Sequence, residues 1–138
     1  MKNKIEFNKP PMLEMGGKVN KNATRVIKGS IFAIVVTLIL LFIYACLLTF
    51  TSLPETTITP VVITISEISI LIGGSISSLK IKRQGMLNGA LVGLIYMIFI
   101  YLISSIFLTG FAIDTKSITM IIVGTIAGMI GGVIGVNL

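Results

Sequence analysis

Four apolar stretches, each about 20 residues long, take up most of this 138-residue chain. A helix rises about 1.5 Å per residue, so roughly 20 residues are enough to cross about 30 Å of hydrocarbon. Charged residues make up 12% of the chain, about half of the roughly 25% that is usual in soluble domains. The sequence therefore predicts four transmembrane helices and leaves no segment that could bury a soluble core. We place the spans at about residues 27–50, 59–79, 86–108 and 117–136.

The short connections between the spans indicate an all-α bundle in which consecutive helices are antiparallel neighbours. The two halves of the chain also resemble each other. Residues 29–49 align with residues 89–109, and residues 65–76 align with residues 123–134, where a pair of adjacent glycines matches. Both halves would enter the membrane from the same side and return to it. We therefore expect two tandem helix hairpins related by an axis along the membrane normal; chance similarity between apolar helices is the alternative.

Residues 1–26 differ in composition from the rest of the chain, because they are basic and contain paired prolines and paired glycines. They lack the apolar periodicity needed to fold alone. The sequence therefore predicts a flexible N-terminal arm, followed by a transmembrane domain at residues 27–138. Such an arm either contacts anionic lipid head groups or a partner, or serves only to set the orientation of the chain.

Positive charge is distributed unevenly over the two ends of the predicted bundle. Residues 1–28 hold seven Lys/Arg, the loop between spans two and three holds three, and the opposite side holds only Lys116. Cytoplasmic loops of membrane proteins are enriched in Lys and Arg. We therefore expect both termini in the cytoplasm. The topogenic residues of the inner loop are Lys80, Lys82 and Arg83.

Small residues recur at every fourth position in spans two to four. Residues four apart share a helix face, and faces of small residues let helix backbones approach closely in a membrane. We therefore expect these glycines to pack the bundle. Span four carries two such stripes, more than one neighbour needs, which leaves a homo-oligomer or another membrane protein open as a partner. The expected packing residues are Gly73, Gly74, Gly85, Gly89, Gly93, Gly124, Gly128, Gly131 and Gly132.

Glu67 is the one acidic residue in any predicted span. An ionised group near the middle of a membrane costs about 2.5–3.5 kcal/mol, so we expect a neutral carboxyl group. In one interpretation it forms a structural hydrogen bond to Thr64, to Ser66 or to a hydroxyl on another span. In the other it is a proton or cation site, although no chain of further acids or bases continues through the membrane.

The chain offers little catalytic chemistry, because it has no histidine and Cys46 is its one cysteine. Metal sites usually need clusters of His and Cys, and nucleophilic catalysis needs a base beside the nucleophile. No glycine-rich phosphate motif follows a strand. The sequence therefore predicts no catalytic residue, no metal site, no cofactor and no nucleic-acid partner. Cys46 is interpreted as a packed or lipid-facing thiol.

One stretch resembles a known family. ISILIGGSISSLKIKRQGMLNGALVGLIYMIFIYLI, residues 68–103, resembles the YrzE-like small four-helix membrane proteins of low-GC Gram-positive bacteria. The resemblance extends over roughly residues 29–135. It is carried by Gly73–Gly74, by the basic loop, and by the glycines and asparagine that open span three. That family has no established activity, so the resemblance implies a location in the inner membrane of a bacterium and a four-helix fold but no mechanism.

These features favour an interaction or scaffolding subunit of a membrane complex, rather than an enzyme. Its expected partners are the lipid bilayer and either a second copy of the chain or another membrane protein. The alternative is a small oligomeric transporter or channel component that uses Glu67.

Overall fold

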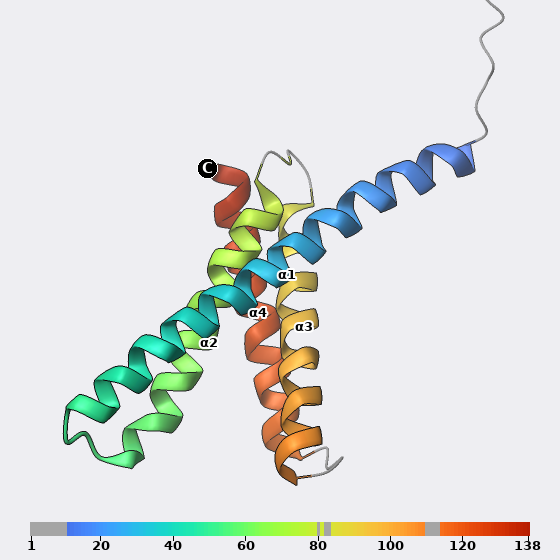
Figure 1. The fold of residues 1–138 in the computed structure, drawn as a ribbon. Coiled ribbons are helices and arrows are strands. Elements are labelled where there is room, and N and C mark those ends of the chain that lie inside the picture. The colour runs from blue at the N-terminus through green and yellow to red at the C-terminus, as the bar shows by residue number, and fades with distance from the viewer. Residues whose placement is uncertain (1–10, 80, 82–83, 110–113) are drawn as a thin grey trace, which may run out of the picture.

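The computed structural model describes the backbone of residues 11–79, 81, 84–109 and 114–138, and the side chains of these residues except 11–20 and 108–109. The described chain contains four long helices and no strand (Figure 1), which confirms the predicted all-α fold. Each helix is long and apolar enough to span a membrane. The helices are α1 (Pro11–Phe50), α2 (Ile58–Ser78), α3 (Gly85–Ser104) and α4 (Thr115–Asn137).

Helices α2, α3 and α4 begin and end close to the boundaries predicted from the sequence. A single turn of 3-10 helix, Glu55–Thr57, leads into α2. Helix α3 ends at Ser104, and a π-helical turn over Ser105–Thr109 completes the third span.

Helix α1 begins at Pro11, well before the predicted start of the first span at residue 27. Residues 11–26 are therefore helical where the sequence predicted a flexible arm, and residues 1–10 of that arm lie outside the described residues. Proline is tolerated in the first helical turn, because its missing N–H would have no partner there. A helix already nucleated by an apolar span adds further turns easily, since propagation is much more favourable than nucleation.

The four helices form two antiparallel hairpins, α1–α2 and α3–α4. Helix α2 packs against the other three helices, whereas α1 does not contact α4 within the described chain. The hairpins lie close together where α2 leads into α3, and they diverge toward the loop that joins α1 to α2 (Figure 1).

The centre of the bundle is small and partly polar. Ile70 and Tyr96 are fully buried there together with Ala33. The hydroxyl groups of Tyr96 and Thr37 lie 2.9 Å apart and form a buried hydrogen bond that joins α3 to α1. Polar and small side chains face inward and large apolar ones face outward, the arrangement expected when lipid tails surround the protein. Buried serines on α2 complete this interior: Ser69, Ser77 and Ser78.

Candidate functional site

Glu67 lies on α2, which begins at Ile58, so the residue sits roughly 14 Å along the helix axis. Its side chain is half-buried. One carboxyl oxygen, Oε2, is shielded and forms no hydrogen bond within the described chain. Buried polar atoms in proteins nearly always have a partner. The exception at Glu67 makes this carboxyl group the first candidate for a functional site.

The Glu67 side chain lines a crevice of about 130 Å³ between α2, α3 and α4. The crevice lies beside the N-terminal half of α2 and the C-terminal half of α3. Its walls are mostly apolar, and the Glu67 carboxyl group is the one acidic group among the lining residues. The other lining residues are Val62, Ile63, Ser66, Tyr96, Met97, Ile100 and Met120. A space of this size can hold a few water molecules or part of a side chain.

The hydroxyl groups near Glu67 are already used elsewhere. Ser66 Oγ donates to the carbonyl oxygen of Val62 at 2.9 Å, and Thr64 Oγ1 donates to its own helix in the same way. The Tyr96 hydroxyl, which also lines the crevice, is paired with Thr37. The structural hydrogen bond expected from the sequence is therefore not formed by Thr64, Ser66 or Tyr96, because each of these hydroxyls is paired elsewhere.

A second group of unpaired hydroxyls lies next to this crevice and was missed by sequence reasoning. A cavity of about 120 Å³ shares Met97, Ile100 and Met120 with the Glu67 crevice and is also lined by Tyr101. The Tyr101 hydroxyl is shielded and has no hydrogen bond among the described residues; the same holds for the Ser105 hydroxyl. In the described chain, three unpaired polar atoms thus lie in the N-terminal half of α2 and the C-terminal part of the third span, whereas two others, Ser77 Oγ and Asn88 Nδ2, lie elsewhere.

Helices α3 and α4 meet backbone to backbone along a line of glycines. A Cβ atom on Gly89 would lie 2.7 Å from Gly132 Cα and would also collide with the Gly128 carbonyl oxygen. A Cβ atom on Gly93 would lie 3.0 Å from the carbonyl carbon of Gly124. Any side chain larger than hydrogen would therefore separate these helices.

Helix α2 uses two adjacent glycines for two different neighbours. A Cβ atom on Gly73 would lie 2.6 Å from the Gly29 carbonyl oxygen of α1. A Cβ atom on Gly74 would instead lie 2.8 Å from the Gly128 carbonyl oxygen of α4. At the start of α3, a Cβ atom on Gly85 would collide with α4. All nine glycines predicted to pack the helices thus lie in helix–helix contacts.

The second small-residue stripe of α4 is covered by α2 within the same chain. A Cβ atom on Gly131 would lie 2.9 Å from Leu71 Cα, and one on Gly135 would lie 2.7 Å from Ser75 Cα. Ser75 Oγ also lies 2.9 Å from the Gly131 carbonyl oxygen, to which it donates a hydrogen bond. The sequence suggested that one of the two stripes of α4 was free to contact a second subunit. The structure shows instead that α2 of the same chain covers this stripe.

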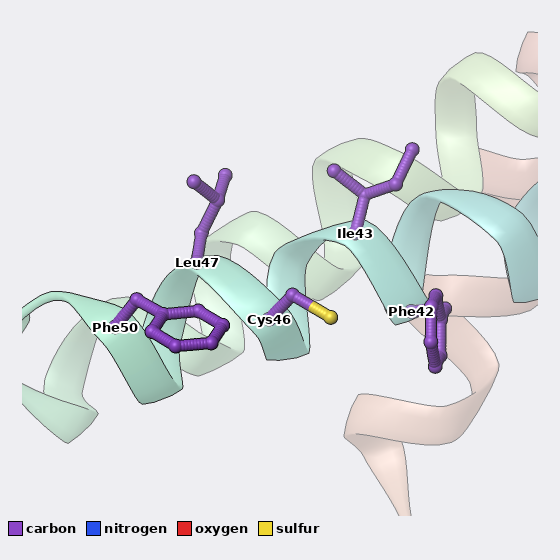
Figure 2. Close-up of a pocket in the computed structure, with 5 residues that line it drawn as sticks. All are labelled: Phe42, Ile43, Cys46, Leu47 and Phe50. Atoms are coloured by element: carbon purple, nitrogen blue, oxygen red, sulfur yellow. The ribbon is translucent and has the colours of Figure 1, made fainter.

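Cys46 lies on the half of α1 that follows the contact with α3, and its thiol is free. Figure 2 shows it with Phe42, Ile43, Leu47 and Phe50, all of them on α1. Together they line a shallow apolar depression of about 230 Å³. A depression on one helix that gathers no polar group suits contact with lipid chains, and it provides no chemistry for the thiol.

One set of predicted residues adds nothing to a site. The topogenic residues Lys80, Lys82 and Arg83 lie outside the described residues. Within the residues that the structure describes, no three His, Cys, Asp or Glu side chains come together in a way that could hold a metal ion.

The family model of DUF3792, a protein of unknown function, matches residues 22–135. The match extends over the membrane-spanning part of all four helices. No curated protein and no solved structure matches the chain. The family match confirms the expectation of an uncharacterised family, but it does not test the resemblance to the YrzE-like proteins.

Proposed function

The chain belongs to the DUF3792 family of proteins of unknown function, and from its geometry we propose that it is an interaction subunit of a membrane complex. In this proposal Glu67 engages a helix of the partner. The observation that carries it is the shielded Oε2 atom of Glu67, which has no partner within the described chain. A carboxyl group inside a membrane is costly, so a bond from another chain would offset that cost.

The shape of the bundle favours binding over passage through the membrane. From Ser69 onward, the side of α2 that faces the bundle is buried, and the glycines there are in backbone contact with α1 and α4. The Glu67 crevice therefore does not continue toward the other end of the bundle through open space. A carrier that exposed Glu67 to both sides would have to separate these backbones.

A cross-linking experiment tests the proposal on the full-length protein. A photoreactive residue at Ile63, which lines the crevice, should form a discrete cross-link to a partner helix in intact membranes. The same residue at Ile130, an exposed position on α4, is the matched control and should not. Glu67→Gln keeps a donor and an acceptor and should retain the cross-link, whereas Glu67→Leu should lose it.

The chain itself should stay folded in both Glu67 variants, because Oε2 has no hydrogen bond to lose. Thermal unfolding in mild detergent measures this directly. A wild-type cross-link in the Glu67→Leu variant would contradict the proposal.

The second candidate function is a small oligomeric transporter or channel component that uses Glu67 as a proton or cation site. The observation in its favour is the crevice of about 130 Å³ beside the carboxyl group, together with the unpaired Tyr101 hydroxyl nearby. The carboxyl group of glutamate can gain and lose a proton, whereas the amide group of glutamine cannot. A Glu67→Gln variant that assembles normally but has lost its biological function would therefore favour this candidate.

We further propose a bacterial inner membrane as the location, with both termini in the cytoplasm. Lys and Arg are concentrated before the apolar part of α1 and between α2 and α3, as expected for cytoplasmic segments. The resemblance of residues 68–103 supports the YrzE-like proteins of low-GC Gram-positive bacteria as relatives. Labelling of a cysteine introduced at Asn137 from outside the cell, in a Cys46→Ser background, would contradict this orientation.

We propose no catalytic activity for the chain, and the residue inventory supports this. Histidine is absent, Cys46 lies among apolar side chains of α1, and Glu67 is the one acid within the spans. A substrate turned over by the purified protein, with loss of turnover in Glu67→Gln, would overturn this statement.

A further inference from the structure

A second crevice, of about 440 Å³, lies between α1 and α3 at the end of the bundle where α3 begins. It is separate from the Glu67 crevice and shares no lining residue with it. Two turns of α1 form one wall and the first turns of α3 form the other. The lining residues are Asn22, Ala23, Val26, Ile27, Gln84, Leu87, Asn88, Leu91 and Ile95.

Asn88 gives this crevice an unused hydrogen-bond donor. Its side chain is only 4% exposed, and its Nδ2 atom is shielded and donates no hydrogen bond within the described chain. A side-chain amide nitrogen carries two N–H groups, and a buried amide without an acceptor requires an explanation. Because Asn88 lines the crevice, a ligand with an acceptor oxygen would satisfy it.

The start of α3 adds backbone donors at the mouth of the same crevice. The residue that precedes the helix, Gln84, has a left-handed backbone with φ 72°, and its side chain does not cap the helix. The first N–H groups of a helix have no partner inside the helix. An uncapped N-terminus therefore favours an anion, and phosphate is a common one.

The length of the crevice matches one leaflet of a bilayer. Its lining on α3 runs from Gln84 to Ile95, which corresponds to roughly 16 Å along the helix. Half of the hydrocarbon thickness of a bilayer is about 15 Å. Apolar side chains such as Val26 and Leu91 form the walls below the amide groups, so an acyl chain fits along them.

Positive charge lies beside the crevice on α1. Lys21, Arg25 and Lys28 are exposed on the same turns of α1 that supply Asn22 and Val26. Basic residues next to transmembrane helices attract the anionic lipids of the inner leaflet. The charge therefore selects an anionic head group over a zwitterionic one.

We propose that this crevice binds one anionic phospholipid. Its phosphate lies at the N-terminus of α3 beside Gln84. Asn88 is about 6 Å further along the helix, where its Nδ2–H donates to an ester carbonyl oxygen of the same lipid. One acyl chain lies between α1 and α3 against Val26 and Leu91.

The test uses the full-length protein in nanodiscs made from equal parts of phosphatidylglycerol and phosphatidylcholine. Native mass spectrometry of the released protein should show one retained phosphatidylglycerol, in clear excess over phosphatidylcholine. Asn88→Leu should lower the amount of retained phosphatidylglycerol about fivefold, through loss of the hydrogen bond to its ester carbonyl oxygen. Asn137→Leu is the matched control, because Asn137 is exposed and its amide already donates to Val133; it should retain the lipid.

A second variant keeps the amide and fills the space instead. Leu91→Trp should displace the acyl chain and reduce lipid retention, whereas Leu94→Trp, which is outside the lining, should not. Glu67→Gln should retain the lipid, since the two crevices are separate. Equal retention of both lipids by the wild type would overturn the proposal. Wild-type retention by Leu91→Trp would overturn it as well, and this variant decides the question if Asn88→Leu does not fold.

Discussion

The two hairpins of this protein have similar sequences but pack differently. In α3–α4, Gly89 and Gly93 bring the backbone of α3 into direct contact with the backbone of α4. In α1–α2, Gly29 and Gly73 lie against each other. Gly131 aligns in sequence with Gly73, but it contacts α2 and not its own hairpin partner α3. A shared pattern of small residues therefore does not dictate which neighbour each stripe contacts.

Burial also separates α1 from the other three helices. Helix α1 has the most apolar centre of the four helices, yet only 11% of the residues there are buried in the protein, against 33% in α2 and 28% in each of α3 and α4. In water the opposite trend would be expected. In a membrane, lipid tails are as apolar as leucine, so close packing of small and polar residues holds helices together. The bundle interior is therefore found in α2, α3 and α4.

The largest effect is expected where α3 and α4 are in backbone contact. Gly89→Leu should lower the free energy of unfolding by about 3 kcal/mol or more, because an overpacked side chain must push two backbones apart. Gly128→Leu should behave in the same way. The midpoint of thermal unfolding in mild detergent measures the change. Ile98→Leu, a volume-conserving change at an exposed position of α3, should have little effect. Equal tolerance of all three variants would refute tight packing in this hairpin.

An intermediate effect is expected at the hydrogen bond between the hairpins. Tyr96→Phe and Thr37→Val each remove one side of the 2.9 Å contact and should each destabilise by about 1 kcal/mol. The double variant should lose less stability than the sum of the losses in the two single variants, because both changes remove the same hydrogen bond. Tyr101→Phe is the control, since the Tyr101 hydroxyl has no hydrogen bond among the described residues. Additive losses would mean that the two hydroxyls do not interact.

The smallest effect is expected on the free face of α1. Phe42 is 71% exposed, so lipid or detergent surrounds most of its ring. Phe42→Ala and Leu47→Ala should each change the free energy of unfolding by less than about 0.5 kcal/mol, measured in the same unfolding experiment. A loss as large as that in Tyr96→Phe would show that a second protein chain covers this face.

Much of the fold could be predicted from the sequence. The four spans, the hairpins and the choice of glycines as packing residues all follow from the length of the apolar runs and the spacing of small residues. The helical turns from Pro11 to Val26 were not predicted. Their composition is polar, and polarity marks the end of a span without marking the end of a helix.

The candidate sites were less accessible to sequence reasoning. Glu67 was singled out because it is acidic in an apolar run, but the lack of a bonding partner for Oε2 depends on where Thr64, Ser66 and Tyr96 place their hydroxyls. Asn88 appeared in the sequence as part of a family pattern. Its unpaired amide became a signal for a ligand when α1 was seen to pass beside α3.

The sequence by itself determined that this chain crosses a membrane in four helices, because bilayer thickness sets the length of each apolar run. The tertiary structure decided which helix each glycine stripe contacts, and where polar atoms remain unpaired. Gly73 and Gly74 are neighbours in the sequence but point to different helices, α1 and α4. The spacing of small residues indicates which face of a membrane helix packs, but it does not record against which neighbour that face packs. That choice is made by the rotation of each helix against the others, which only the assembled bundle defines.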